Sequence, residues 1–277
     1  MVVYPNAKIN LGLYVLNVRS DGLHNLETVF FPVPLRDTLE IRPLRMSNAP
    51  WELVLAGRRV EGEPKDNLIV RVFTSLQEEF HLPPTSLYLD KKIPTGAGLG
   101  GGSSDAAFMM MMLNEAFDLN LSKNEMKRRL SAIGADCAFF IDNKPAFATG
   151  TGSELSSLPA VSLKDKWLVL VKPPCSVSTR DAYADVACRQ ESPVDLREIL
   201  QKPVGQWRGV VTNDFEHSVF PRYPLIGVIK DTLYDMHALY ASMSGSGSAV
   251  FGIFDHQPYS DLGAVFKDCF VFQSRLI

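Results

Sequence analysis

The sequence predicts an α+β fold whose elements fall into two domains, residues 1–155 and 156–277. Apolar residues alternate from Ala7 to Val15, which is the pattern of a strand with one buried face. The segment 103–117 is apolar on nearly every side, as expected for a fully buried helix. A polar stretch that contains proline, residues 153–165, separates these elements from a second set of strands and helices.

The composition narrows the class of protein. Of 277 residues, 46% are hydrophobic and 21% charged, which is typical of a globular chain that can bury a core. A net charge of -3 without a basic run argues against a nucleic-acid partner, and the absence of a long apolar run argues against a membrane span. The start lacks the pattern of a secretory signal, and four scattered cysteines form no C-x-x-C pair. We therefore expect a reducing, cytoplasmic setting with no disulfide framework or zinc site.

The sequence pattern predicts short strands and three helices in the first half of the chain. An Asp21-Gly22 turn returns the first strand into a second, and Asn67 and Ser122 stand where helices would be capped. The pattern predicts strands over 7–15, 28–31, 39–41, 51–55 and 87–89, and helices over 68–80, 103–117 and 122–133. The four methionines of the second helix are expected to fill the core.

The second half repeats the mixture of strands and helices. A strand is predicted over 167–171, and helices over 181–189 and 225–240. A glycine-serine turn that starts at Ser242 then leads into an apolar strand ending at Phe254.

A glycine run lies between the strand at 87–89 and the buried helix. Residues 94–107 read PTGAGLGGGSSDAA. A strand, a glycine-rich loop and a helix start together offer backbone N–H groups to an anion such as phosphate. Ser103 and Ser104 add hydroxyl groups that can donate hydrogen bonds or bind magnesium. Valine at Gly101 is expected to block phosphate binding and to spare the fold.

Three common phosphate motifs do not account for this run. The P-loop pattern fails because no lysine follows the glycines. The dinucleotide pattern is matched by Gly96, Gly98 and Gly101, but the acidic residue Asp118 falls on the same helix rather than after a following strand. The protein-kinase loop fails because neither H-R-D nor D-F-G follows.

The motifs taken together resemble the small-molecule kinases grouped as galactokinase, homoserine kinase, mevalonate kinase and phosphomevalonate kinase (the GHMP superfamily). Within it they are most similar to the kinases of the non-mevalonate isoprenoid pathway, which phosphorylate a cytidine-diphosphate-linked polyol. The resemblance spans residues 7–254 and rests on AKINL at 7–11, DGLH at 21–24, the glycine run, GAD at 134–136 and SGSGS at 244–248. It implies a two-domain GHMP kinase fold with the active site in the cleft between domains.

The resemblance also implies roles for individual residues. Asp136 would accept the proton of the acceptor hydroxyl, and Lys8 would offset charge on the transferred group. Lys8 and Asn10 are two residues apart and so point to one face of their strand. The co-substrate would be ATP with Mg²⁺, for which Ser104 is a candidate ligand. The ATP-binding residues would be Asn67, Leu68, Pro94, Thr95, Gly96, Ala97, Gly98, Leu99, Gly100, Gly101, Gly102, Ser103 and Ser104. The substrate-binding residues would be Asn10, His24, Tyr183, Gly245 and Ser246, with His24 reading the cytosine edge and Tyr183 stacking on the base.

Two other functions remain open at this point. One is another kinase of the superfamily, such as a mevalonate or homoserine kinase, and the other is a non-catalytic sensor of a nucleotide or metabolite. The protein would act on small molecules as a monomer or homodimer. Three positions depart from the family pattern: Leu23 replaces a tyrosine, Cys137-Ala138 replaces Val-Pro, and Ser153 stands where glutamate is common.

Overall fold

A computed structural model describes residues 1–44, 49–158, 161, 163–258 and 261–276. These residues form two compact units that are interleaved along the chain. The first unit comprises residues 1–7, 35–95 and 100–144, and the second comprises residues 8–34, 96–99 and 145–277. The predicted domain boundary near residue 155 stays a prediction.

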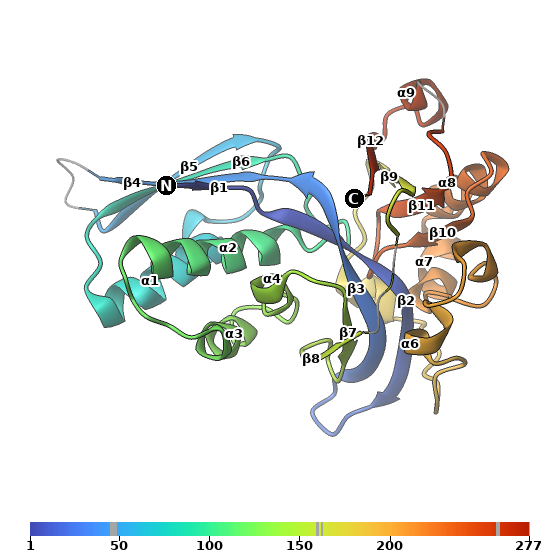
Figure 1. The fold of residues 1–277 in the computed structure, drawn as a ribbon, viewed down its shortest axis with the longest axis horizontal. Helices are drawn as coiled ribbons and strands as arrows, with labels where there is room; N and C mark the ends of the chain where they lie inside the picture. Colours follow the sequence, from blue (N-terminus) through green and yellow to red (C-terminus); the bar gives the residue numbers. More distant parts are fainter. Residues whose placement is uncertain (45–48, 159–160, 162, 259–260, 277) are drawn as a thin grey trace. The chain divides into compact units, whose positions relative to one another are not determined.

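The first unit contains a sheet with the strand order β1-β4-β6-β5 (Figure 1). Only β5 and β6 are parallel, and the other neighbours are antiparallel. Burial alternates strictly along β6, so one face of the sheet is covered and the other is not. The strands are β1 (Val2–Val3), β4 (Thr38–Pro43), β5 (Trp51–Gly57) and β6 (Thr85–Lys91).

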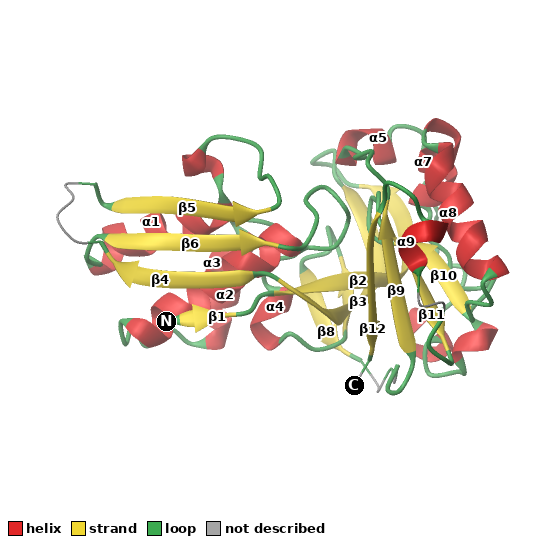
Figure 2. Ribbon diagram, turned by 90° about the horizontal axis from the view of Figure 1, so that it is seen from above, coloured by secondary structure: helices red, strands yellow, loops and turns green. Residues whose placement is uncertain are grey.

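Helices α1 and α2 cover one face of this sheet (Figure 2). The Asn67 side chain caps α1 by accepting from Ile69 N, and Ser122 caps α3 by accepting from Glu125 N. Met109, Met110 and Met112 are buried in α2, which confirms core filling for three of the four methionines, while Met111 is half-buried. The helices are α1 (Leu68–Phe80), α2 (Gly101–Ala116), α3 (Lys123–Ser131), α4 (Phe139–Asp142) and the 3₁₀ turn η1 (Pro64–Asp66).

The second unit contains two sheets. One has the order β2-β3-β7-β8 and the other the order β10-β11-β9-β12, which is antiparallel throughout. The first sheet is formed by β2 (Asn6–Val18), β3 (His24–Arg36), β7 (Ala146–Thr149) and β8 (Glu154–Ser157). The second is formed by β9 (Trp167–Lys172), β10 (Tyr240–Met243), β11 (Val250–Phe254) and β12 (Phe270–Arg275).

A single apolar cluster joins β2 to the elements of the C-terminal half. It brings Leu13 and Val15 together with Val169, Phe215 and Leu233. Helix α8 packs against β10 and β11. The helices of this unit are α5 (Thr179–Tyr183), α6 (Leu196–Ile199), η2 (Val204–Gln206), α7 (Phe215–Arg222), α8 (Pro224–Asp235) and α9 (Leu262–Val265).

Most predicted elements are confirmed, but the ends of two helices are wrong and several elements were not predicted. The helix expected over 181–189 ends at Tyr183, because the later chain lies along β2 and Arg189 N donates to Val15 O at 2.9 Å. The helix expected over 225–240 ends at Asp235, because His237 has a φ of 68° and Tyr240 already belongs to β10. Strand β8 lies inside the predicted polar break, of which residues 159–160 and 162 are outside the described residues. The elements that were not predicted also include strands β1, β7, β10 and β12 and helices α4, α6, α7 and α9. Among the helices that the structure describes, none has both the length and the apolarity to cross a membrane.

Candidate functional site

Lys8 and Asn10 lie on the same face of β2, as their spacing predicts. Their exposed fractions are 3% and 2%, and Lys8 Nζ donates to Asn10 Oδ1 at 2.7 Å. The ammonium group also lies 4.8 Å from the centroid of the Phe30 ring. A buried ammonium group is costly unless it has partners of this kind, so its orientation on the strand is well defined.

The Asn10 amide is fixed by a second partner on β3. Asn10 Nδ2 donates to Thr28 Oγ1 at 2.9 Å, and Thr28 Oγ1 donates to Gly12 O at 2.5 Å. The amide therefore has one orientation, with its oxygen toward Lys8 and its nitrogen toward Thr28.

Ser244 joins Asn10 to the tip of the glycine run. Asn10 N donates to Ser244 Oγ at 3.2 Å, and Ser244 Oγ donates to Gly98 O at 2.8 Å. The predicted substrate residue Gly245 lies beside Asn10, since a Cβ on Gly245 would be 3.3 Å from Asn10 Oδ1. Ser246 is half-buried on the same turn. No sequence pattern marks Thr28, and the SGSGS motif does not by itself show the contacts of Ser244, because the partners of both residues are distant in the chain.

The tip of the glycine run is anchored through the carbonyl groups of three consecutive residues, of which Gly98 bonds to Ser244. Ala97 O accepts from Ala249 N at 3.1 Å, and Leu99 O accepts from Lys8 N at 2.9 Å. Gly96 and Gly98 have φ values of 58° and 72°, a region that residues with a Cβ rarely adopt. Glycine is also required at 98 because a Cβ there would overlap Ser244 O. Pro94 is buried, and Thr95 is exposed at the start of the loop.

Helix α2 begins directly after the loop with an uncapped N-terminus. Its N-cap residue, Gly100, has a φ of 67° and provides no side-chain cap. The first N–H groups of a long helix that lacks a cap are suited to bind an anion. A Cβ on Gly101 would lie 2.8 Å from Ile93 Cγ2, so valine there would disturb the packing beneath the loop rather than only block a ligand.

Ser103 and the turn that carries Asp136 lie close together in the first unit. Asp136 is half-buried between α3 and α4, and Cys137 Sγ and Ser103 Oγ lie 3.0 and 4.0 Å from the position that a Cβ on Gly134 would take. Burial raises the pKa of Cys137 to about 11, so this thiol stays protonated. Cys137 and Ala138 are buried, which fits a packing role for this departure from the family pattern.

Asn67 and Leu68 lie at the start of α1, on the side of α2's first turn. Leu68 Cδ1 is 3.8 Å from the position that a Cβ on Gly102 would take. The Asn67 side chain accepts from Ile69 N at 3.1 Å, so its oxygen serves as a helix cap. The two residues therefore border the start of α2.

His24 and Tyr183 are brought together in the second unit. Their ring centroids are 4.7 Å apart at an interplanar angle of 31°, and Tyr183 also packs edge-on against Phe215 at 4.8 Å. Leu23, which replaces the family's tyrosine, is 54% exposed. The two aromatic rings thus form a platform on which a base could stack.

A buried ion cluster beneath the start of α2 has no sequence signal. Lys91 at the end of β6 donates to Asp37 and, at 2.7 Å, to Asp105 of α2. Asp37 Oδ1 also accepts from Ile93 N at 2.8 Å. Burial raises the pKa of Asp105 to about 7. The Lys91 ammonium group lowers this pKa, but the negative charge of Asp37 raises it again. The cluster ties the segment before the loop to the helix after it.

We expect the stability that Asp105 contributes to fall as the pH rises. Its pKa is about 7 in the fold against an ordinary 3.8, so its contribution is complete below pH 3.8 and is lost as the pH rises through 7. The free energy of unfolding of the Asp105→Asn variant should therefore decline less than that of the wild type between pH 5 and 8, by about 1–3 kcal/mol. Urea unfolding across this range measures the difference. The exposed control Asp142→Asn should follow the wild type, and an Asp105→Asn curve parallel to the wild type would refute the assignment.

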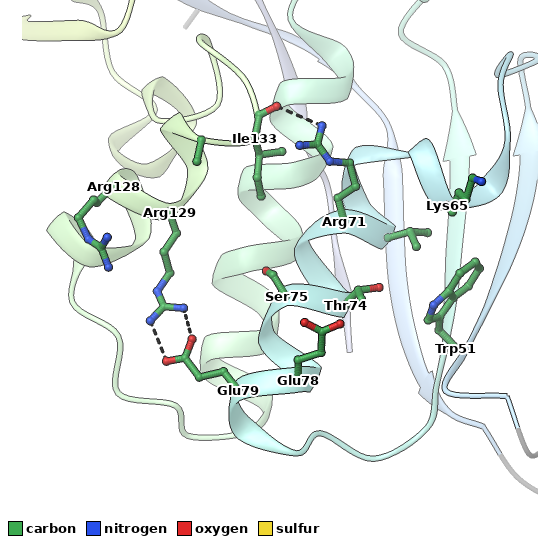
Figure 3. A pocket seen from close by; sticks show the side chains of 12 residues that line it. Trp51, Lys65, Arg71, Thr74, Ser75, Glu78, Glu79, Arg128, Arg129 and Ile133 are labelled. Atoms are coloured by element: carbon green, nitrogen blue, oxygen red, sulfur yellow. Dashed lines mark hydrogen bonds and ion pairs between the residues drawn. The ribbon is translucent and has the colours of Figure 1, made fainter.

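A pocket of about 820 Å³ lies over the outer side of α1 (Figure 3). Arg129 on α3 pairs there with Glu79, while Arg71 contacts Ile133 O at 3.5 Å. None of the sequence-predicted site residues lines this pocket. Its size alone does not connect it with phosphoryl transfer.

Matches to two family domains define the class of protein. Residues 67–150 match the N-terminal domain of GHMP kinases, and residues 188–265 match their C-terminal domain. The fold agrees, since a crystal structure of mevalonate kinase from Methanococcus jannaschii aligns with a TM-score of 0.71 at 12% identity, covering 100% of this chain and 98% of that one.

Similarity within the superfamily is more specific. A 4-diphosphocytidyl-2-C-methyl-D-erythritol kinase from Bacteroides fragilis is 50% identical over 100% of both chains, and one from Porphyromonas gingivalis is 44% identical over 99% of both. A crystal structure of 4-(cytidine 5'-diphospho)-2C-methyl-D-erythritol kinase aligns with a TM-score of 0.77 at 27% identity, covering 99% of this chain and 98% of that one. The chain belongs to the GHMP kinases and, among them, to the family of the 4-diphosphocytidyl-2-C-methyl-D-erythritol kinases.

Proposed function

We propose that the protein transfers a phosphoryl group from ATP to the 2-hydroxyl of 4-diphosphocytidyl-2-C-methyl-D-erythritol, in the non-mevalonate route to isoprenoid precursors. The observation that carries the proposal is the 50% identity, over the full chain, to a kinase that bears this substrate's name. Kinases of this family use ATP as co-substrate. The cytoplasmic setting and the monomeric or homodimeric state stay predictions from the sequence.

The residues divide the work of phosphoryl transfer among them. This reaction needs positioning and neutralisation of charge more than covalent help from the protein. The N–H groups at the start of α2 bind phosphate oxygens, and Lys8 stabilises the charge of the transferred group. Asn10, which Thr28 and Ser244 hold in one orientation, aligns the acceptor hydroxyl. Asp136 accepts the proton of that hydroxyl.

A magnesium ion would accompany ATP, and Ser104 fits the role of a ligand. Among the described residues, Ser104 Oγ is a buried oxygen atom for which no hydrogen-bond partner is found. Mg²⁺ prefers oxygen ligands and usually binds few protein groups besides the phosphates. The ion would supply positive charge that offsets the negative charge of the phosphate groups of ATP. The described residues contain no cluster of three His, Cys, Asp or Glu side chains that could hold a metal without the nucleotide.

The cytidine base is recognised by the platform of His24 and Tyr183. We expect His24→Ala and Tyr183→Ala each to weaken binding of the cytidyl substrate by about 1–3 kcal/mol, through loss of a hydrogen bond and of stacking respectively. Steady-state kinetics should show a higher KM for this substrate and a nearly unchanged KM for ATP. Tyr183→Phe, which keeps the ring, and His217→Ala, an exposed histidine on α7, should behave like the wild type. Normal cytidyl KM values in both alanine variants would remove the basis for base recognition.

A substrate panel tests the proposed function itself. Coupled ATP turnover is measured with the cytidyl methylerythritol substrate, mevalonate and homoserine, each at several concentrations. Turnover with the cytidyl substrate alone is the expected result. Turnover only with mevalonate or homoserine would identify a different kinase of the superfamily, whereas ATP binding without turnover on any of the three would favour a sensor.

A further inference from the structure

The hydroxyl group of Ser244 joins three sequence motifs within the second unit. Ser244 has an exposed fraction of 0%, and its Oγ accepts from Asn10 N at 3.2 Å and donates to Gly98 O at 2.8 Å. It also lies 3.5 Å from Asn10 Oδ1, the atom that accepts from Lys8 Nζ. One side chain of the SGSGS motif at 244–248 thus contacts both the lysine-bearing strand and the glycine loop.

The turn that carries Ser244 is fixed by hydrogen bonds with the Asn213 and Glu216 side chains. Asn213, with an exposed fraction of 2%, donates from Nδ2 to Met243 O at 2.8 Å and to Gly245 O at 2.9 Å. Its Oδ1 accepts from Phe215 N at 3.0 Å, so the amide cannot turn over without losing all three bonds. On the other side, Glu216 accepts from Met243 N at 2.9 Å. The hydroxyl of Ser244 is therefore presented at a fixed position.

We propose that Ser244 is a positioning residue of the kinase reaction, which sets the tip of the phosphate-binding loop relative to Asn10. The inference rests on the proposed function, because it assigns Gly98 to ATP and Asn10 to the acceptor. Gly98 and Asn10 lie on separate segments, and the Ser244 hydroxyl bonds to both at once. If the Ser244 hydroxyl is removed, the buried N–H of Asn10 and the carbonyl of Gly98 each lose a hydrogen-bond partner. The side chain at 244 then no longer holds the loop at a fixed distance from the strand.

A purely structural role predicts a different outcome. Ser242 is a matched control, because it lies two residues earlier, is 1% exposed, and donates to Glu216 Oε1 at 3.1 Å rather than to either motif. Removal of either hydroxyl should lower stability to a similar extent. Only removal of the Ser244 hydroxyl should change catalysis, and it should act on ATP and on turnover rather than on the cytidine base.

The test compares Ser244→Ala and Ser244→Cys with Ser242→Ala in the full-length protein. Ser244→Ala should lower kcat by about 10- to 100-fold and raise the KM for ATP, since each unpaired buried group costs about 1–3 kcal/mol. The KM for the cytidyl substrate should stay within about twofold of the wild type. Ser244→Cys keeps the volume but has only a weak donor, so it should resemble Ser244→Ala. Ser242→Ala should keep wild-type kinetics.

A double-variant cycle provides the second readout. In an Asn10→Ala background, Ser244→Ala should lower kcat less than it does in the wild type, because the side chain that it positions is already absent. Full activity of Ser244→Cys, or additive losses in the cycle, would overturn the inference and leave Ser244 a packing residue. If Ser244→Ala does not fold, the cysteine variant and its cycle decide the question. A wild-type protein without cytidyl kinase activity would instead refute the proposed function, and the two failures are distinct.

Discussion

Replacement of Asp136 by asparagine is expected to lower kcat by about 10²–10⁴-fold, the range associated with loss of a general base. Asparagine keeps the shape of the side chain but cannot accept the proton of the acceptor hydroxyl. Asp136 is half-buried in a turn, so the substitution should leave the fold intact. Binding of ATP and of the cytidyl substrate should change little, and single-turnover kinetics together with calorimetric binding separates the two effects.

Controls and a second variant make this result interpretable. Asp142→Asn changes an exposed carboxylate of α4 that pairs with Lys123, and should keep wild-type turnover. Lys8→Met should also be severely damaging, because it removes the buried positive charge. If both side chains serve one proton-transfer step, the double variant should lose far less than the product of the single losses. An Asp136→Asn protein with most of its turnover would leave only a structural role for this carboxylate.

Gly98→Ala is expected to weaken ATP binding by about 100-fold or more. A Cβ at this position would overlap Ser244 O, and the φ of 72° is itself unfavourable for alanine. Since Ser244 is fully buried, the loop must move away from it, and a displacement of this kind costs at least about 2.7 kcal/mol of binding free energy. Isothermal titration calorimetry with ATP measures the loss.

Gly209→Ala is the matched control for the glycine loop. Gly209 has a similar φ of 76°, but no atom lies within 4 Å of the position that its Cβ would take. The Gly209→Ala variant therefore has the same kind of backbone strain as Gly98→Ala but no steric overlap. Its affinity for ATP should equal that of the wild type. Equal affinity in Gly98→Ala would show that the loop tip does not contact the nucleotide.

Local patterns accounted for the elements that are stabilised locally. The helix over 68–80 was predicted to the residue because Asn67 caps it and apolar residues recur on one side. The helix after Tyr183 failed because the backbone of that segment bonds to β2 instead, a choice that depends on a strand at the other end of the chain. Helix α7 was missed for a similar reason, since it starts where Asn213 and Asp214 bond to distant segments.

In the candidate site, too, local spacing predicted some positions, whereas contacts between distant segments were not predictable. The i, i+2 spacing of Lys8 and Asn10 was sufficient to place them on one face of a strand, and the hydrogen bond between them confirms it. The proximity of His24 and Tyr183 came from family resemblance rather than from a pattern in the residues. The SGSGS motif contains Ser244 but does not show its contacts, and Lys91, Asp37 and Asp105 carry no pattern. These contacts depend on how separate strands are brought together.

The burial of β2 has a consequence for biosynthesis. This strand is translated well before β9, α7, α8 and β11, yet Leu13 and Val15 pack against residues of these elements. At about 5–20 residues per second, the apolar face formed by Leu13 and Val15 stays uncovered for on the order of tens of seconds, although β3 can already pair with β2 on one side. During that time the free edge of β2 is a template for pairing with other chains. Strand β2 is therefore the segment for which a chaperone that binds extended apolar peptides would matter most.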